Sequence, residues 1–275
     1  MVKEVKPQDL GTGQPITWCP GCPNHGIFES VKRAVSETIN NSGGKLGQKD
    51  FAITTGIGCS GKIFDYLKLN GFYGLHGRPI PTAMGIILAN PNFKVLAFAG
   101  DGDTYSEGMA HFIHAFRYNP DMTLVVHDNQ SFSLTTGQST PVSQQGFENK
   151  ANPLGEYNQP FNPIKIALSA GATFIARCNA LDVNHTVEIL KKAINHKGFS
   201  YVEIMQKCLI FNKDMNDIDS LMYKIKDNKD LNKAYELANE WDYNSKKGKI
   251  PLGVLYQNIK KVRTLDEKLE KIRKK

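Results

Sequence analysis

Lys94-Val-Leu-Ala-Phe-Ala-Gly-Asp-Gly-Asp103 is the stretch of sequence that decides the fold. Its apolar part, residues 95–99, shows no polar alternation, which is typical of a strand buried on both faces of a parallel sheet. Gly100 and Gly102 end this strand, and a helical pattern follows from about residue 107 to residue 118. A strand, a glycine turn and a helix in this order form the geometry at which α/β proteins bind phosphates.

The acidic residues in this turn indicate that a metal ion accompanies the phosphate. An aspartate repels a phosphate unless a cation lies between them, so Asp101 and Asp103 predict a diphosphate bridged by a metal. A second strand, residues 122–127, ends just before Asp128 and Asn129, at the same edge of the sheet. A lone Gly-Asp-Gly is more often a surface turn, but with Asn129 placed 28 residues after Asp101 it resembles the thiamine diphosphate fingerprint.

Length and composition are typical of an ordinary globular protein of one α/β domain. The chain has 275 residues, of which 40% are hydrophobic and 22% charged. No apolar run approaches the ~20 residues that span a bilayer, and the first residues lack the apolar core of a secretory signal. We therefore expect a cytoplasmic protein that does not contact membranes. We expect a single domain over residues 1–275, with an extended arm over residues 1–16 and a peripheral, helical, basic extension over residues 212–275.

The net charge of +7 is concentrated near the C-terminus. Residues 246–275 contain eleven Lys or Arg against three Asp or Glu, so the rest of the chain is close to neutral. A basic tail of this kind is usually a solvated helix face and less often attracts an acidic partner. Because the sequence lacks interleaved aromatic residues and glycine-rich RNA-reading motifs, we do not expect nucleic-acid binding.

Five cysteines suggest a metal or a cluster. Without an export signal disulfides are not expected, so ligation becomes the leading use. Cys19 and Cys22 form a Cys-x-x-Cys turn before a helix, where a redox pair, a zinc site and an iron–sulfur site compete. Cys59 and Cys208 each follow a predicted strand, and Cys178 also follows a strand end, so it is not excluded by position alone.

Strand and helix patterns alternate along the chain and predict a doubly wound, mainly parallel sheet. A polar loop as long as residues 130–163 is usually functional or a lid. Residues 249–256 are interpreted as an extended connector, and His111 and His114 as ordinary helix residues. The predicted strands are 51–54, 95–99, 122–127, 172–176 and 199–205, and the predicted helices are 27–39, 79–89, 107–118, 164–170, 183–196 and 231–241.

Six motifs in this order resemble the β subunit of 2-oxoacid:ferredoxin oxidoreductases, and the resemblance covers nearly the whole chain. They are Trp-Cys-Pro-Gly-Cys (18–22), Gly-Ile-Gly-Cys-Ser-Gly-Lys (56–62), Leu-His-Gly-Arg (75–78), Gly-Asp-Gly-Asp (100–103), His-Phe-Ile-His-Ala-Phe-Arg (111–117) and Leu-Thr-Thr-Gly-Gln (134–138). The resemblance implies a [4Fe–4S] cluster held by four of the five cysteines, with Cys178 free. The four are Cys19, Cys22, Cys59 and Cys208.

The same resemblance implies thiamine diphosphate held through Mg²⁺ on Asp101, Asn129 and the main-chain carbonyl of Ser131. Other residues would contact the cofactor itself: Gly100, Gly102, Asp103, Ser60, His76 and the apolar Leu134. His76 is a catalytic candidate that competes with a purely structural histidine. Lys62, the second catalytic candidate, could hold a carboxylate near the cluster, but it is more often a surface lysine.

The implied activity is the oxidative decarboxylation of a 2-oxo acid with coenzyme A, which yields acyl-CoA and CO₂ and passes electrons to ferredoxin. The chain leaves no room for a pyrimidine-binding domain, so the resemblance implies a heterodimer with an α subunit that carries it. Thr136 stands where several members that use 2-oxoglutarate have Lys, which mildly favours pyruvate or a broad range of substrates, with 2-oxoglutarate possible. Two alternatives stay open: half of a non-oxidative thiamine decarboxylase or synthase with a structural zinc site, and a nucleotide-binding module without catalysis.

Overall fold

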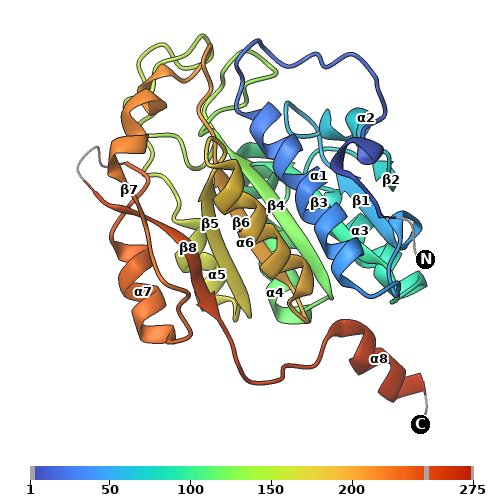
Figure 1. Ribbon diagram of the computed structural model, residues 1–275. Helices are drawn as coiled ribbons and strands as arrows, with labels where there is room; N and C mark the ends of the chain where they lie inside the picture. The colour runs from blue at the N-terminus through green and yellow to red at the C-terminus, as the bar shows by residue number, and fades with distance from the viewer. Residues whose placement is uncertain (1–3, 245–247, 274–275) are drawn as a thin grey trace.

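The protein is described by a computed structural model that covers residues 4–244 and 248–273, without the side chains of residues 214–217 and 273. One sheet forms its centre, with the strand order β2-β1-β3-β4-β6-β5-β8-β7 (Figure 1). The strands are β1 Phe51–Thr55, β2 Asn70–Tyr73, β3 Lys94–Gly100, β4 Met122–Asp128, β5 Phe174–Asn179, β6 Ser200–Met205, β7 Met222–Lys224 and β8 Ile250–Gln257. The α-helices are α1 Asn24–Asn41, α2 Ile63–Tyr66, α3 Pro79–Ala89, α4 Met109–Tyr118, α5 Pro163–Ser169, α6 Val183–Asn195, α7 Leu231–Asn239 and α8 Leu265–Arg273.

The strands from β2 to β5 in this order are parallel, and β8 runs antiparallel to β5. The prediction of a doubly wound, mainly parallel sheet is therefore confirmed. The chain moves outward from β1 to β2 and then crosses to β3 on the other side of β1. This change of direction is the topological switch point at which open α/β sheets bind their ligands.

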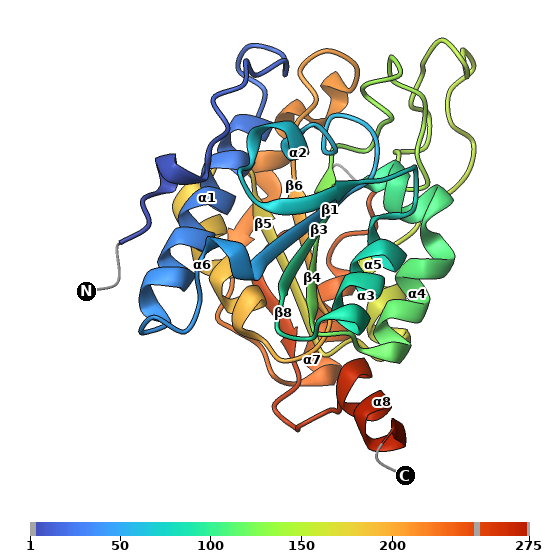
Figure 2. The same ribbon diagram turned by 90° about the vertical axis from the view of Figure 1, so that its right-hand side faces the viewer.

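Helices cover both faces of the sheet, as Figure 2 shows with the sheet seen nearly edge-on. Apolar side chains of α1 and α6 form one core with the sheet, and those of α3, α4, α5 and α7 form the other. This two-sided burial explains why β3 and β4 consist of nearly uninterrupted apolar residues. The carboxyl ends of the parallel strands consequently lead into polar turns along a single edge, at the top of Figure 1.

The C-terminal part differs from the predicted peripheral, helical extension over residues 212–275. Residues 250–257, interpreted from the sequence as a connector, form the buried strand β8, and both β8 and β7 belong to the sheet. Pro251 and Gly253 hide this strand from pattern analysis, because both residues are rare in strand interiors. Helix α8 lies apart from the sheet (Figures 1 and 2).

Two smaller differences lie at the ends of elements. The edge strand β2 is exposed along its whole length and carries no apolar run, which explains why the sequence did not predict it. The helix predicted from residue 107 begins earlier, as a π-helical turn over Asp103–Glu107, before α4. None of the helices in the part of the chain that the structure describes is both long and apolar enough to cross a membrane.

Candidate cofactor and cysteine sites

A small pocket lies at the switch point, between the turns that follow β1, β3 and β4. Its volume is about 40 Å³, and residues 57–60, 76, 100–103, 127, 129 and 131–135 line it. All residues predicted to hold thiamine diphosphate or Mg²⁺ line this pocket: Ser60, His76, Gly100, Asp101, Gly102, Asp103, Asn129, Ser131 and Leu134. Their convergence follows from the parallel sheet, which brings the carboxyl ends of β1, β3 and β4 together.

Two oxygen-bearing side chains form the floor of this pocket. Asp101 is only 1% exposed, and its carboxylate accepts hydrogen bonds from Thr140 Oγ1 (2.6 Å) and from the Asn129 N–H (3.4 Å). Burial raises the pKa of the Asp101 carboxyl to about 7, despite these bonds. The amide oxygen of Asn129 accepts from the hydroxyls of Ser131 (3.1 Å) and Ser133 (3.0 Å). Carboxylate, amide and main-chain oxygens are the ligands that Mg²⁺ prefers, so this floor suits that ion.

Further buried polar atoms in the pocket suit a phosphate. Ser60 is buried, and its hydroxyl finds no hydrogen-bond partner among the described residues. A side chain at position 100 would place its Cβ 3.4 Å from Ser60 Oγ, so Gly100 keeps the space in front of this hydroxyl clear. Gly102 has another role, because a Cβ there would lie 2.3 Å from the ring of Phe132. A free buried hydroxyl beside a glycine turn is a fitting donor for an anionic ligand.

Asp103 lines the pocket and connects its own turn to the turns of Gly56 and Gly77. Its Oδ1 accepts a hydrogen bond from the Gly77 N–H (2.7 Å) and lies 3.1 Å from His76 Nδ1. A Cβ at Gly56 would lie 1.6 Å from Asp103 Oδ2, so the carboxylate occupies the space that Gly56 leaves. Burial raises the pKa of Asp103 to about 6, while the Gly77 N–H and His76 lower it. Asp103 thus orients His76, whose side chain is 37% exposed, toward the pocket.

A second cavity of about 140 Å³ lies next to the first. The four cysteines predicted to hold a cluster line it together with Trp18, Lys62 and Gln206: Cys19, Cys22, Cys59 and Cys208. Burial, with a smaller contribution from the other thiols, raises the pKa of Cys59 to about 11, although Lys62 lowers it. In their ionised form the four thiolates would repel one another, and a positively charged metal centre between them would offset that repulsion. In the parts of the chain that the structure describes, no three His, Cys, Asp or Glu side chains form a ready site for a single ion.

The sulfur atoms receive hydrogen bonds that the sequence did not predict. The Gln206 side-chain amide donates to Cys22 Sγ (3.6 Å), and the Phe211 N–H donates to Cys208 Sγ (3.4 Å). Lys62 lines this cavity and not the switch-point pocket, and its Nζ donates to the Thr17 carbonyl (3.4 Å). Cys178 is buried within β5 and does not line the cavity, and burial raises the pKa of its thiol to about 12.

The two cavities are neighbours, because four residues line both of them: Cys59, Asn129, Ser133 and Leu134. Leu134 is 44% exposed and stands between the predicted metal ligands and the cysteines. A ligand in the switch-point pocket would therefore lie against the same wall as a cluster held by the cysteines.

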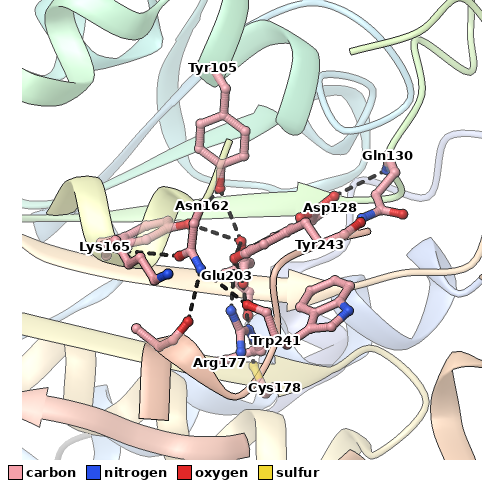
Figure 3. Close-up of polar contacts among 12 residues, drawn as sticks. Tyr105, Asp128, Gln130, Asn162, Lys165, Arg177, Cys178, Glu203, Trp241 and Tyr243 are labelled. Carbon is pink, nitrogen blue, oxygen red and sulfur yellow. Dashed lines mark hydrogen bonds and ion pairs between the residues drawn. The ribbon is translucent and has the colours of Figure 1, made fainter. Parts of the chain in front are cut away.

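A buried charged cluster lies next to Asp128 and Gln130, in the turn after β4, and the sequence analysis missed it (Figure 3). Arg177 on β5 and Glu203 on β6 are cross-strand partners, with Arg177 Nε 2.6 Å from Glu203 Oε2. The Tyr243 hydroxyl donates to the same carboxylate (2.7 Å), and the Tyr243 carbonyl accepts from the Gln130 side chain (3.3 Å). Burial, together with Asp101 and Glu203, raises the pKa of the neighbouring Asp128 well above its usual range. The sequence does carry a signal for this cluster, because one arginine and one glutamate interrupt two otherwise apolar strand patterns.

Comparison with known proteins assigns the chain to a family. Residues 56–204 match the model of the thiamine pyrophosphate enzyme C-terminal, TPP-binding domain. A 2-oxoacid:ferredoxin oxidoreductase subunit beta of Saccharolobus solfataricus is 38% identical over 88% of this chain and 81% of its own length. The 2-oxoglutarate synthase subunit KorB of Archaeoglobus fulgidus is 38% identical over 70% of each chain.

A solved structure has the same fold as this chain. It is the 2-oxoglutarate:ferredoxin oxidoreductase from Magnetococcus marinus with 2-oxoglutarate, coenzyme A and succinyl-CoA bound. Its TM-score is 0.91 at 36% identity, over 99% of this chain and 91% of that chain. The family and the oxidoreductase class predicted from the motifs are thus confirmed. The chain belongs to the β subunits of the 2-oxoacid:ferredoxin oxidoreductases and contains their thiamine diphosphate-binding domain.

Proposed function

We propose that this subunit holds thiamine diphosphate through Mg²⁺ at the switch-point pocket and a [4Fe–4S] cluster in the cysteine cavity. With its α subunit, it catalyses the coenzyme A-dependent oxidative decarboxylation of a 2-oxo acid and passes the electrons to ferredoxin. The observation that carries this proposal is the shared wall between the two cavities, formed by Cys59, Asn129, Ser133 and Leu134. Thiamine diphosphate supplies the chemistry that releases CO₂, and a [4Fe–4S] cluster accepts electrons one at a time.

The residues of the switch-point pocket take separate roles. Asp101, the Asn129 side chain and the Ser131 carbonyl bind Mg²⁺, and the Ser60 hydroxyl and the main chain at Gly100 and Gly102 receive the diphosphate. Because burial raises the pKa of Asp101, a divalent cation favours its ionised form and relieves the cost of burying the charge. Leu134 supports the apolar part of the cofactor at the wall between the cavities.

His76 and Lys62 act on different sites. His76, held by Asp103, presents its half-buried ring to the pocket and carries a proton or binds the substrate carboxylate there. Lys62 acts on the cysteine cavity, because its positive charge lies close enough to lower the pKa of Cys59. Asp103 supports the cofactor mainly by fixing His76 and the neighbouring turns.

Four cysteines around one cavity support a cluster. In a [4Fe–4S] cluster each thiolate binds a different iron, so the sulfurs stand apart, whereas a zinc ion draws four sulfurs to ~2.3 Å from one point. Gln206 and the Phe211 N–H donate to the sulfurs of Cys22 and Cys208, and such bonds tune the potential of a cluster. Cys178 remains outside this group.

The substrate is a 2-oxo acid, and the relatives' names include both a broad 2-oxoacid class and 2-oxoglutarate. Thr136 brings no cation to the loop that precedes Gly137, so a second carboxylate gains no ion pair from this position. We therefore propose a broad range that includes pyruvate and extends to 2-oxoglutarate. The switch-point pocket of about 40 Å³ holds only about three water molecules, so it accommodates only part of the cofactor, and the α subunit supplies the rest of the site.

The test is to co-express this chain with its α subunit and purify the complex in the absence of oxygen. We expect about four irons and little zinc per β subunit, and reduction of a viologen dye that depends on a 2-oxo acid and coenzyme A. A panel of pyruvate, 2-oxobutyrate and 2-oxoglutarate then measures the substrate range. One zinc per subunit, no iron and no dye reduction would reject the proposal in favour of a non-oxidative enzyme with a structural zinc site.

A further inference from the structure

The turn that carries Cys208 also contacts the metal-binding turn. Residues 208–212, the Cys208 turn, are closed by an antiparallel bridge between Cys208 and Asn212. Asn212 is 2% exposed, and its Nδ2 donates to the main-chain carbonyls of Asn129 (3.0 Å) and Gln130 (3.3 Å). A single amide group thus connects the turn bearing one proposed cluster ligand to the turn bearing two proposed Mg²⁺ ligands, Asn129 and Ser131.

The residue that Asn212 holds adopts an uncommon conformation. Gln130 is fully buried and has φ 53°, in the left-handed region that a non-glycine residue seldom adopts. Its N–H donates to Asp128 Oδ1 (3.1 Å), and its carbonyl also accepts from Ser143 Oγ (2.6 Å). Such backbone persists only where its surroundings determine it, and these contacts fix the sharp bend between Asn129 and Ser131.

A second contact joins the Cys208 turn to the far end of the same loop. A Cβ at Gly137 would lie 2.9 Å from Cβ of Phe211, so the Phe211 side chain packs directly on Gly137. Thr136 and Gly137 both have positive φ values, 79° and 96°. The Cys208 turn therefore contacts residues 129–130 and residue 137, on either side of the segment that contains Ser131 and Leu134.

We infer that Asn212 is a positioning residue that couples the cluster site to the thiamine diphosphate site, an inference that rests on the proposed function above. Movement of Cys208 on binding a cluster shifts the carbonyls of Asn129 and Gln130 through this amide, and movement of the metal turn shifts Cys208 in return. Coupling of this kind is reciprocal, so each cofactor changes the binding of the other by the same factor.

The test uses the anaerobic αβ complex and two readouts besides turnover. The first is the electron paramagnetic resonance spectrum of the dithionite-reduced cluster, recorded with and without thiamine diphosphate and Mg²⁺. The second is the affinity for thiamine diphosphate, measured by calorimetry in the presence of Mg²⁺. Asn212→Asp keeps the side-chain shape but removes both N–H donors and places an oxygen against two carbonyls.

We expect the cofactor to shift the spectrum of the wild-type complex, and Asn212→Asp to abolish that shift and weaken thiamine diphosphate binding about tenfold. The matched control is Asn228→Asp. Asn228 Nδ2 also donates to two main-chain carbonyls, those of Asp230 (2.8 Å) and Leu255 (2.9 Å), but the residue lines neither cavity. The control should keep both the spectral shift and the affinity of the wild-type complex.

If Asn212→Asp does not assemble, Phe211→Ala removes the other contact of the Cys208 turn and should reduce both signals in the same direction. An Asn212→Asp complex, or the Phe211→Ala complex used in its place, that keeps the wild-type shift and affinity overturns the coupling, as does a wild-type spectrum that does not respond to the cofactor. Wild-type protein that binds neither iron nor thiamine diphosphate refutes the proposed function itself, and the coupling with it.

Discussion

Replacing Arg177 with Met should destabilise the chain by about 3–5 kcal/mol, because it leaves the buried carboxylate of Glu203 without its cation. The side chains of Arg177 and Glu203 are 2% and 0% exposed, so solvent does not screen the loss. The guanidinium also lies 5.5 Å from the ring centres of Trp241 and Tyr243, and these cation–π contacts disappear with it. Neutral hydroxyl donors then remain for Glu203, namely those of Tyr243 (2.7 Å), Tyr201 (3.2 Å) and Tyr105 (3.4 Å), and none of them brings a positive charge.

The assay is urea unfolding followed by circular dichroism, with an exposed ion pair as the control. Lys192 Nζ lies 2.6 Å from Asp227 Oδ2, the same separation as in the buried pair, but these side chains are 43% and 38% exposed. Lys192→Met should therefore cost only about 0–1 kcal/mol. If Arg177→Met costs no more than Lys192→Met, burial does not determine the strength of the Arg177–Glu203 pair and the reasoning fails.

Three further predictions concern the two cavities. Gly56→Ala should displace the Asp103 carboxylate, since the new Cβ would lie 1.6 Å from its Oδ2. Calorimetry should then show that thiamine diphosphate binds at least about tenfold more weakly, while the fold stays intact. Cys59→Ser should lower the iron content of the anaerobic complex, whereas Cys178→Ser should leave it unchanged, because only Cys59 lines the cysteine cavity. Burial raises the pKa of Asp101 from 3.8 to about 7, so in EDTA its contribution to stability is present below about pH 4 and lost as the pH rises through 7. The melting temperatures of the wild-type protein and of Asp101→Asn should therefore diverge between about pH 4 and pH 7. Melting temperatures that change in parallel with pH would contradict the raised pKa of Asp101.

The sequence was sufficient to predict where residues that follow buried strands lie in the fold. Asp101 and Asn129 stand directly after strands, and Cys59 stands in the turn after β1. Parallel strands carry such positions to one edge regardless of the details of packing. Arg177 and Glu203 escaped prediction for the opposite reason. Each looks like an isolated interruption of an apolar run, and only the register of β5 on β6 shows that they face each other.

The same distinction explains why the C-terminal part was misjudged. Periodicity identifies elements from their neighbours in sequence, but β8 contains Pro251 and Gly253 and is recognised as a strand only through its pairing with β5. The Tyr243 segment before it has no pattern of its own. It is nevertheless buried and contacts both Glu203 and Gln130.

Distant residues hold the turn that follows β4, with Asn129 and Gln130, in place. Gln130 is fixed by Ser143, Asn212 and Tyr243, which lie 13, 82 and 113 residues away along the chain. The motif around Asp101 and Asn129 thus supplies the proposed Mg²⁺ ligands, but their placement depends on distant segments whose composition carries little signal. A strained residue such as Gln130 needs support from several directions at once, and a local stretch of sequence cannot provide it. Grafting the motif alone onto another parallel sheet would therefore transfer the donor atoms without the geometry that makes them a site.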